Sequence, residues 1–247
     1  MLSTRNLNKA FGSLVVAGEL TLDIPRGARH ALIGPNGAGK TTLINLITGM
    51  LRPDSGAVLL GGEEITSLKP EARVRRGLAR TFQINALFPR LTALESVTLA
   101  VLERDRQAHN WWRALPGFAA AIEEARQILA SLRIPPEKET RQLAYGQQRL
   151  LEIALALATR PRVLLLDEPA AGVPKDESQE LFAAIAGLSS ELTILFIEHD
   201  MNVVFRFASR IHVMVGGRLL VKGTPDEIAR DERVREVYLG RGHRAAA

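Results

Sequence analysis

The chain has 247 residues, a formal net charge of +5 and no cysteine. The lack of cysteine excludes disulfides, thiolate metal sites and cysteine nucleophiles, while 46% hydrophobic and 24% charged residues are typical of a globular protein. The amino terminus lacks the pattern of a secretory signal, and no apolar run approaches the roughly 20 residues of a membrane-spanning helix. We therefore expect a soluble chain that is not exported.

The positive charge comes from arginines that are spread along the chain. The densest group has irregular spacing and no interleaved aromatic residues, and it comprises Arg73, Arg75, Arg76 and Arg80. This pattern favours a solvated helix face over an interface with nucleic acid. We therefore expect no nucleic acid among the partners.

The chain begins with a strand-rich segment and continues with a strand-loop-helix unit. Short alternating segments favour strands, and Pro25-Arg26-Gly27 ends them. A strand over residues 28–33 and a helix over residues 40–50 follow, and the breaker cluster at 52–56 closes the unit.

A strand over residues 77–82 leads to a region from about residue 86 to 145 whose apolar residues recur at helical spacing. We expect an inserted helical subdomain there, with Trp111 and Trp112 in it. Near-continuous apolar runs follow, as is typical of parallel strands buried on both faces, over residues 163–166, 193–197 and 211–215. The core is therefore predicted to be α/β, with a frayed tail over residues 241–247.

A phosphate-binding loop is predicted between the first of these strands and its helix. The sequence Gly34-Pro35-Asn36-Gly37-Ala38-Gly39-Lys40-Thr41 fits the pattern G-x-x-x-x-G-K-[ST]. The backbone must wrap around the phosphate so that its N–H groups point at the phosphate oxygens, and glycine is required where a side chain would block this approach. Lys40 is expected to reach the β- and γ-phosphates of ATP, Thr41 to hold Mg²⁺ and Thr42 to contact the α-phosphate. The alternative is a glycine-rich turn without a ligand.

Two carboxylates, Asp167 and Glu168, follow the apolar run over residues 163–166. The carboxyl end of a parallel strand lies at the edge of the sheet where phosphate-binding loops also lie. Asp167 is expected to hold Mg²⁺ through its water shell, and Glu168 to act as general base on the attacking water. The alternative is a strand end with two solvated acids.

Four further motifs accompany the loop and the acidic pair in a characteristic order. Phe11 precedes the loop, and Arg80-Thr81-Phe82-Gln83 follows it. Leu143-Ala144-Tyr145-Gly146-Gln147 and Ile197-Glu198-His199-Asp200 flank the acidic pair. With these motifs the chain resembles the ATP-binding cassette (ABC) family over nearly its whole length.

The resemblance implies one ABC ATPase domain over residues 1–247. The expected fold is α/β, a phosphate-loop NTPase (RecA-like) core with a parallel sheet, an amino-terminal antiparallel β subdomain and an inserted α-helical subdomain. The division that we expect is a nucleotide-binding core over 1–85 and 150–230, a helical signature subdomain over 86–149, and a carboxy-terminal helix and tail over 231–247.

The resemblance also assigns roles in the site. Glu168, His199 and Gln83 are the expected catalytic residues, and His199 would sense the γ-phosphate. Gln83 joins Thr41 and Asp167 as a Mg²⁺ contact, and Phe11 would stack on adenine. Alone, Gln83 would be an ordinary polar loop residue, His199 a satisfied histidine and Phe11 a core residue.

The signature motif implies a second cassette. The expected nucleotide contacts lie at the start of a helix, where the partial positive charge suits a phosphate. These residues are Ala144, Tyr145, Gly146 and Gln147. In this family two cassettes meet head to tail, and each signature helix caps the ATP held by the other. Ala144 replaces the usual serine and Tyr145 a more frequent glycine, and the D-loop segment over residues 170–173 lacks its usual aspartate.

The details are most similar to the ATPase subunits of bacterial importers for branched-chain amino acids. The segments that carry this likeness are Arg80-Thr81-Phe82-Gln83 with Leu87-Phe88-Pro89, Tyr145-Gly146-Gln147-Gln148-Arg149, Glu168-Pro169-Ala170-Ala171-Gly172, Glu198-His199-Asp200-Met201, Gly223-Thr224-Pro225 and Tyr238-Leu239-Gly240. The resemblance implies a membrane permease, a homo- or heterodimer of cassettes and, indirectly, a periplasmic solute-binding protein. It also implies a cytoplasmic location at the inner face of the membrane.

Other functions within and beyond this family are kept as alternatives. A urea or amide importer and a lipopolysaccharide exporter use similar cassettes. A soluble cassette protein acting on nucleic acid or ribosomes commonly has two cassettes or long inserted arms, which this sequence lacks. A phosphate-loop kinase or regulatory switch would leave the signature motif unexplained.

Overall fold

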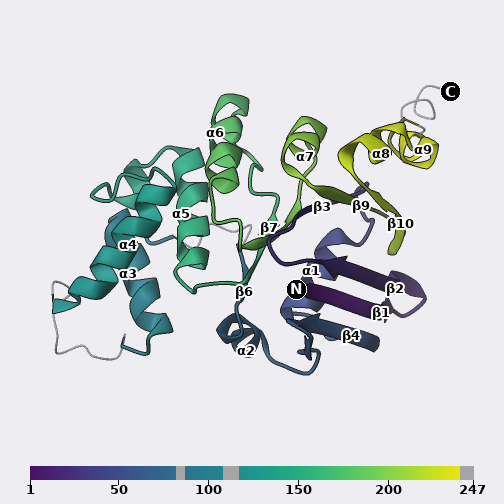
Figure 1. Cartoon of the computed structure of the whole chain (residues 1–247), viewed down its shortest axis with the longest axis horizontal. Helices are drawn as coiled ribbons and strands as arrows, with labels where there is room; N and C mark the ends of the chain where they lie inside the picture. Colours follow the sequence, from purple (N-terminus) through teal and green to yellow (C-terminus); the bar gives the residue numbers. More distant parts are fainter. Residues whose placement is uncertain (82–86, 108–116, 240–247) are drawn as a thin grey trace.

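The computed structural model describes residues 1–81, 87–107 and 117–239 (Figure 1). Two sheets lie beside each other, with a group of helices at one end and the last helices of the chain at the other. Trp111 and Trp112 fall outside the described residues, so their predicted place in the helical subdomain stays a prediction.

The smaller sheet is antiparallel and contains the strands predicted at the amino terminus. Its order is β2 (Leu14–Ile24), β1 (Leu2–Phe11), β4 (Ser55–Leu60) and β5 (Glu63–Glu64). Along β2, residues 20, 22 and 24 are buried and their neighbours 21 and 23 are exposed. One face of this sheet therefore packs on the core and the other faces water.

The larger sheet has six strands and forms the centre of the molecule. Its order is β10 (Arg218–Gly223), β9 (Arg210–Val215), β3 (Arg29–Ile33), β8 (Thr193–Ile197), β7 (Val163–Asp167) and β6 (Leu78–Arg80). All neighbouring pairs are parallel except β9 and β10. The predicted α/β class and the parallel sheet are confirmed.

Strand β7 shows why the apolar runs in the sequence are nearly continuous. Val163 and Leu165 belong to one hydrophobic cluster, and Leu164 and Leu166 belong to the other. All four side chains are buried because both faces of the sheet are covered.

Helices cover the two faces differently. On one face α1 (Lys40–Thr48) packs with the antiparallel sheet, and its buried residues share a cluster with Leu32 and Leu165. The other face is covered by α5 (Tyr145–Leu157), α6 (Lys175–Ala186) and α7 (Met201–Phe207). The helix that follows the phosphate loop and the signature helix α5 are therefore on opposite faces of the sheet.

The helical layer at the end of the molecule consists of α3 (Ala93–Arg104) and α4 (Ala119–Ser131) packed with α5 (Figure 1). Helix α3 begins at a capping box in which Thr92 and Glu95 satisfy each other's backbone N–H groups. The predicted helical subdomain ends at residue 149, whereas helix α5 continues to Leu157. The division into subdomains stays a prediction.

The remaining helices are short, and they are α2 (Pro70–Arg75), a 3₁₀ turn (Thr140–Gln142), α8 (Pro225–Arg230) and α9 (Glu232–Leu239). Within the three described ranges, none of the helices has both the length and the apolar character to cross a bilayer. The strand predicted over residues 77–82 is shorter than expected, since β6 ends at Arg80.

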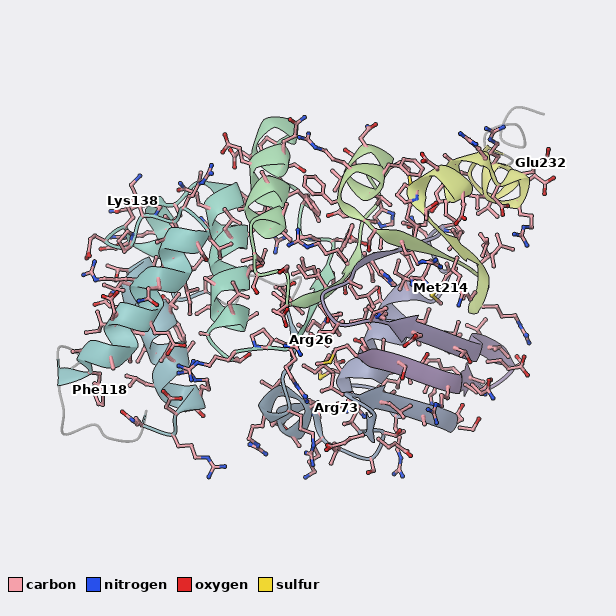
Figure 2. All side chains as sticks on the ribbon, viewed as in Figure 1. Arg26, Arg73, Phe118, Lys138, Met214 and Glu232 are labelled. Atoms are coloured by element: carbon pink, nitrogen blue, oxygen red, sulfur yellow. The ribbon has the colours of Figure 1, made fainter. Side chains whose placement is uncertain are left out.

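Arg73, labelled in Figure 2, is buried, so the prediction that it lies on a solvated helix face is wrong. Its side chain is only 1% exposed, and its guanidinium donates to the carbonyl oxygens of Leu46 at 2.8 Å and Ile47 at 2.6 Å. It also donates to the carbonyl oxygens of residues 66 and 68. The last carbonyls of a helix have no partner within the helix, so Arg73 caps α1 from a neighbouring element. Residues 75 and 76 are exposed, as expected.

Two buried histidines face each other across β3 and β9. Nδ1 of His30 lies 2.9 Å from Nε2 of His212, and both side chains are buried. Burial, with the positive charge of Arg210, lowers the pKa of His30 to about 4. Burial, with the neighbouring His30 and the cations Lys222 and Arg210, lowers the pKa of His212 to about 3. Both imidazoles are therefore neutral in the folded protein near pH 7.

We predict that this pair makes stability depend on pH. The unfolded chain binds protons on both histidines below about pH 6.5, whereas the folded chain does not until about pH 4 and 3. The stabilisation is complete above pH 6.5, and at pH 5 about 1 to 2 kcal/mol per histidine should be lost. Chemical denaturation at pH 7.5, 6.5 and 5.0 measures this loss.

The variant His212→Gln keeps a hydrogen-bonding group but cannot titrate in this range, so its free energy of unfolding should fall less steeply with pH. An identical pH dependence in His212→Gln and the unmodified chain would contradict the prediction.

Candidate active site

The loop over residues 34–39 joins the end of β3 to the first residue of α1, as the sequence predicted. Its fold is held by hydrogen bonds from the N–H of Ala38 to the carbonyl oxygen of Pro35 at 3.1 Å, and from the N–H of Gly217 to the carbonyl oxygen of Ala38 at 3.0 Å. The turn between β9 and β10 thus supports the loop. The structure brings Gly34, Pro35, Asn36, Gly37, Ala38 and Gly39 together at the carboxyl end of β3.

Gly37 has a left-handed backbone, with φ of +79°. A β carbon there would meet no atom of the described chain within 4 Å. The space beside Gly37 is therefore open, as a loop that receives a phosphate group requires.

Lys40 begins α1 and turns back over the loop. Its Nζ donates to the carbonyl oxygens of Gly34 at 2.7 Å and Pro35 at 3.1 Å. Burial lowers the pKa of Lys40, and the nearby carboxylates of Glu168 and Asp167 oppose this shift. The amine thus lies between the loop and the acidic pair. In the same turn, the side chain of residue 41 is exposed and that of residue 42 is half-buried.

Asp167 ends β7 with a fully buried side chain. Its Oδ2 accepts a hydrogen bond from Nη2 of Arg80 at 2.6 Å, and Nη1 of Arg80 donates to Oδ1 of Asn45 at 2.6 Å. Oδ1 of Asp167 has no hydrogen-bond partner among the described residues. A buried carboxylate oxygen without a partner is costly unless a cation or its water shell satisfies it, so this residue fits a Mg²⁺ site.

Arg80 is the second correction to the expected solvated helix face. It lies in β6 and not in a helix, and its side chain is 12% exposed. Both Arg80 and Asn45 were missed as site residues. The only signal in the sequence was the position of Arg80 three residues before Gln83. Gln83 itself falls outside the described residues, so its role stays a prediction.

Glu168 has a left-handed backbone with φ of +50°, which is rare and strained for a residue other than glycine. Its N–H donates to the carbonyl oxygen of Ile197 at 3.1 Å, and its Oε1 lies 2.8 Å from Nε2 of His199. The two side chains predicted to act on the γ-phosphate therefore contact each other at the carboxyl ends of β7 and β8.

Glu198 is a buried residue that the sequence did not single out. Its carboxylate accepts hydrogen bonds from the N–H of Ala170 at 3.0 Å and from the N–H of His199 at 3.2 Å. Burial raises the pKa of Glu198, and the two backbone N–H groups oppose this shift. Glu198 thus ties the segment after Glu168 to the residue that carries the imidazole.

Phe11 lies at the end of β1, beside the hairpin that leads to β2. It is 55% exposed, with Nζ of Lys9 5.5 Å from the ring centroid. This hairpin approaches the phosphate loop, because a β carbon on Gly39 would lie 2.5 Å from the carbonyl oxygen of Val16. The exposure rules out the alternative that Phe11 is a core residue.

The signature segment forms the start of α5, whose first turn has no cap from the side chain of Ala144. Instead, the N–H of Gly146 donates to Oε2 of Glu177 on α6 at 2.9 Å. The hydroxyl of Tyr145 accepts a hydrogen bond from Nη2 of Arg149 at 2.8 Å and donates to the carbonyl oxygen of Ala171 at 3.4 Å. Gln147 reaches back to the N–H of residue 144 at 3.4 Å. The signature helix is thereby joined to the D-loop segment and α6.

A cleft of about 220 Å³ adjoins the acidic pair and is lined by Glu168, Glu198, His199 and the segment over residues 170–173. A larger cleft, about 590 Å³, lies at the opposite edge of the sheet between Arg26, Arg162 and Leu192. The smaller cleft is part of the candidate site, because Glu168 and His199 line it, and the phosphate loop and Asp167 lie at the same edge of the sheet.

Comparison with known families gives two matches. The family described as "ABC transporter" matches residues 17–171, which is more than half of the chain. A second family, described as "Branched-chain amino acid ATP-binding cassette transporter", matches residues 218–244.

Individual relatives extend over nearly the whole chain. The high-affinity branched-chain amino acid transport ATP-binding protein BraF of Pseudomonas aeruginosa is 39% identical over 251 residues, covering 97% of this chain and 98% of that protein. LivG of Escherichia coli K12, with the same description, is 37% identical over 249 residues, covering 97% and 98%.

Among solved structures, the ADP conformation of MJ1267, an ATP-binding cassette of an ABC transporter, superposes with a TM-score of 0.85 at 30% identity and covers 97% of this chain and 98% of that one.

We predict that Gly37→Ala abolishes nucleotide binding with little loss of stability. Its β carbon would fill the open space beside the loop, and the left-handed backbone should cost about 1 kcal/mol. Gly62→Ala is the matched control, since Gly62 has φ of +89° and equally open surroundings in the turn between β4 and β5. Thermal denaturation and binding of a fluorescent ATP analogue measure the two effects. Equal nucleotide affinity in both variants would contradict the prediction.

Proposed function

The chain belongs to the ATP-binding cassette family of ABC transporters, and we propose that it is the ATP-hydrolysing subunit of an importer for branched-chain amino acids. The contact between Glu168 and His199 beside Asp167 is the observation that carries the ATPase proposal. The match over residues 218–244 and the relatives BraF and LivG support the choice of solute.

ATP would bind with its phosphates in the loop over residues 34–39 and its adenine against Phe11. Lys40 exchanges its bonds to the loop carbonyls for bonds to the β- and γ-phosphates, which are stronger because both partners are charged. Thr41 and Thr42 follow at the start of α1, where the helix dipole favours the negative phosphates. The exposed Phe11 ring offers a flat apolar surface on which adenine can stack.

Thr41, Asp167 and Gln83 would hold the Mg²⁺ ion that accompanies ATP. Oδ1 of Asp167, buried without a partner among the described residues, supports this assignment. When bound, the ion supplies positive charge that neutralises the β- and γ-phosphate oxygens.

Hydrolysis would use Glu168 as the general base. Its carboxylate accepts a proton as the water oxygen bonds to the γ-phosphorus, and the bond from that phosphorus to the bridging oxygen of ADP breaks. His199 would donate a hydrogen bond to a γ-phosphate oxygen, and Gln83 is the third residue that we propose to act in this step. His199 would then exchange its 2.8 Å contact with Glu168 for the hydrogen bond to the γ-phosphate oxygen.

A second cassette would complete the site. The first turn of α5 offers Ala144, Tyr145, Gly146 and Gln147 to the ATP held by the partner, and the partner's signature helix contacts the ATP held here. Because α5 and α1 pack on opposite faces of the sheet, the signature helix is poorly placed to serve its own loop.

ATP would close the two cassettes, and hydrolysis would reopen them. This movement would pass to a membrane permease, with the chain at the cytoplasmic face of the membrane. A periplasmic solute-binding protein would deliver the solute. The exposed Phe88, which follows the segment of Gln83, supports a docking surface there. The solute never contacts this subunit, so a urea or amide importer and a lipopolysaccharide exporter remain outcomes of the test below.

We predict that Glu168→Gln binds ATP normally but hydrolyses it roughly 10² to 10⁴ times more slowly, because an amide cannot accept the proton. In ATP and Mg²⁺ it should also accumulate as a closed dimer, measured by size-exclusion chromatography with light scattering. Glu191→Gln is the matched control, since Glu191 is an exposed carboxylate that pairs with Arg26 away from the site. Unchanged hydrolysis in Glu168→Gln would remove Glu168 from the role of base.

The importer proposal is tested by retrieving partners from membranes of the source cell. Tagged Glu168→Gln chain is added with ATP and Mg²⁺ to detergent-solubilised membranes, and the bound proteins are identified by mass spectrometry. Recovery of a permease encoded with a branched-chain amino acid binding protein is the expected result. Recovery of a urea importer or a lipopolysaccharide exporter would change the proposed solute. Recovery of soluble proteins or nucleic acid alone would overturn the importer proposal.

A further inference from the structure

We propose that Arg80 is a positioning residue for Asp167. Its guanidinium fixes one carboxylate oxygen of Asp167 and leaves the other for the hydrated Mg²⁺ of the bound nucleotide. This inference rests on the ATP and Mg²⁺ site of the proposed function, and it adds a residue from β6 to that site.

The contacts of Arg80 join three elements of the core. Nη2 donates to Oδ2 of Asp167 at the end of β7, and Nη1 donates to Oδ1 of Asn45 in α1, both at 2.6 Å. Arg80 itself ends β6, the strand next to β7. The guanidinium therefore ties the metal-binding strand to the helix that follows the phosphate loop.

The two oxygens of Asp167 are divided between two partners. Oδ2 is held by Arg80, and Oδ1 has no hydrogen-bond partner in the described part of the chain. A carboxylate held at one oxygen cannot rotate freely, so Oδ1 points in one direction before any metal arrives. Mg²⁺ demands a near-ideal octahedral arrangement, and orienting its ligand in advance favours binding.

Arg80 also balances negative charge in the site. Asp167 and Glu168 are adjacent carboxylates, and the side chain of Asp167 is fully buried. Among the described residues, Lys40 interacts electrostatically with both carboxylates, and Arg80 forms an ion pair with Asp167. The Arg80 guanidinium therefore supplies a positive charge 2.6 Å from the buried carboxylate of Asp167.

The geometry requires arginine and not only a positive charge. The planar guanidinium donates from two different nitrogens to two acceptors on different elements, whereas a lysine ammonium is a single point on a flexible stem. Arg80→Lys therefore preserves the charge and removes the bridge. Asn45→Ala preserves the pair with Asp167 and removes only the anchor on α1.

The test compares ATP affinity with and without metal. The full chain carries Glu168→Gln in every sample to prevent hydrolysis, and isothermal titration calorimetry gives the Kd for ATP in EDTA and in Mg²⁺. Arg80→Lys should bind ATP in EDTA as the parent does, while the gain in affinity from Mg²⁺ should shrink about 10- to 100-fold, the usual effect of losing a residue that orients a metal ligand. Asn45→Ala should lose part of the same gain.

Arg104→Lys is the matched control. The side chain of Arg104 is 14% exposed and pairs with Glu124 and Asp105 in the helical layer, so it resembles Arg80 in burial and pairing but lies outside the site. It should keep the full gain from Mg²⁺. Thermal denaturation of every variant shows whether it is folded.

Three results would overturn the proposal. A folded Arg80→Lys with the full gain from Mg²⁺ would make Arg80 a purely structural residue. If Arg80→Lys lost equal ATP affinity in EDTA and in Mg²⁺, Arg80 would act on the phosphate loop through α1 and not on the metal ligand. A similar loss in Arg104→Lys would show general destabilisation. Failure of the parent chain to bind ATP at all would instead refute the proposed function.

Discussion

The site depends on a parallel sheet whose strands are buried on both faces. Because β3, β7 and β8 run in the same direction, their carboxyl ends meet at one edge of the sheet. The phosphate loop follows β3, Asp167 and Glu168 end β7, and His199 follows β8. Residues more than 160 positions apart thus reach one edge of the sheet without any long loop, and the packed core fixes their relative positions.

Buried cations then connect this edge to the helices around it. Arg73 binds the last carbonyls of α1, and Arg80 joins the same helix to Asp167. Helix α1 is therefore held near its carboxyl end by one arginine and along its length by the other, while its amino end carries Lys40. A phosphate that moves the loop would act on a helix with little freedom to shift, so the strain would pass to the contacts of Arg80 and Asp167.

The sequence predicted those features that depend on neighbouring residues. The phosphate loop, the apolar strands and the strand-loop-helix unit follow from local spacing, and the fold class and family are confirmed. It failed for Arg73 and Arg80, because the pattern of charges along a chain does not show which of them the fold will bury. The same limit explains why Glu198 was missed. Its role is to accept hydrogen bonds from two backbone N–H groups, and only the tertiary structure shows these contacts. The roles of the individual site residues stay predictions.

The start of the signature helix shows how a tertiary contact replaces a local one. A serine at the position of Ala144 would offer a hydroxyl to the first turn, and alanine cannot. Here the carboxylate of Glu177 accepts the hydrogen bond from Gly146, and a β carbon at Gly146 would lie only 2.7 Å from Oε2 of Glu177. A β carbon at Gly146 would therefore force the Glu177 side chain to move and would disturb this hydrogen bond. One backbone N–H in the first turn of α5 thus has an anionic acceptor on α6, although Ala144 offers no hydroxyl.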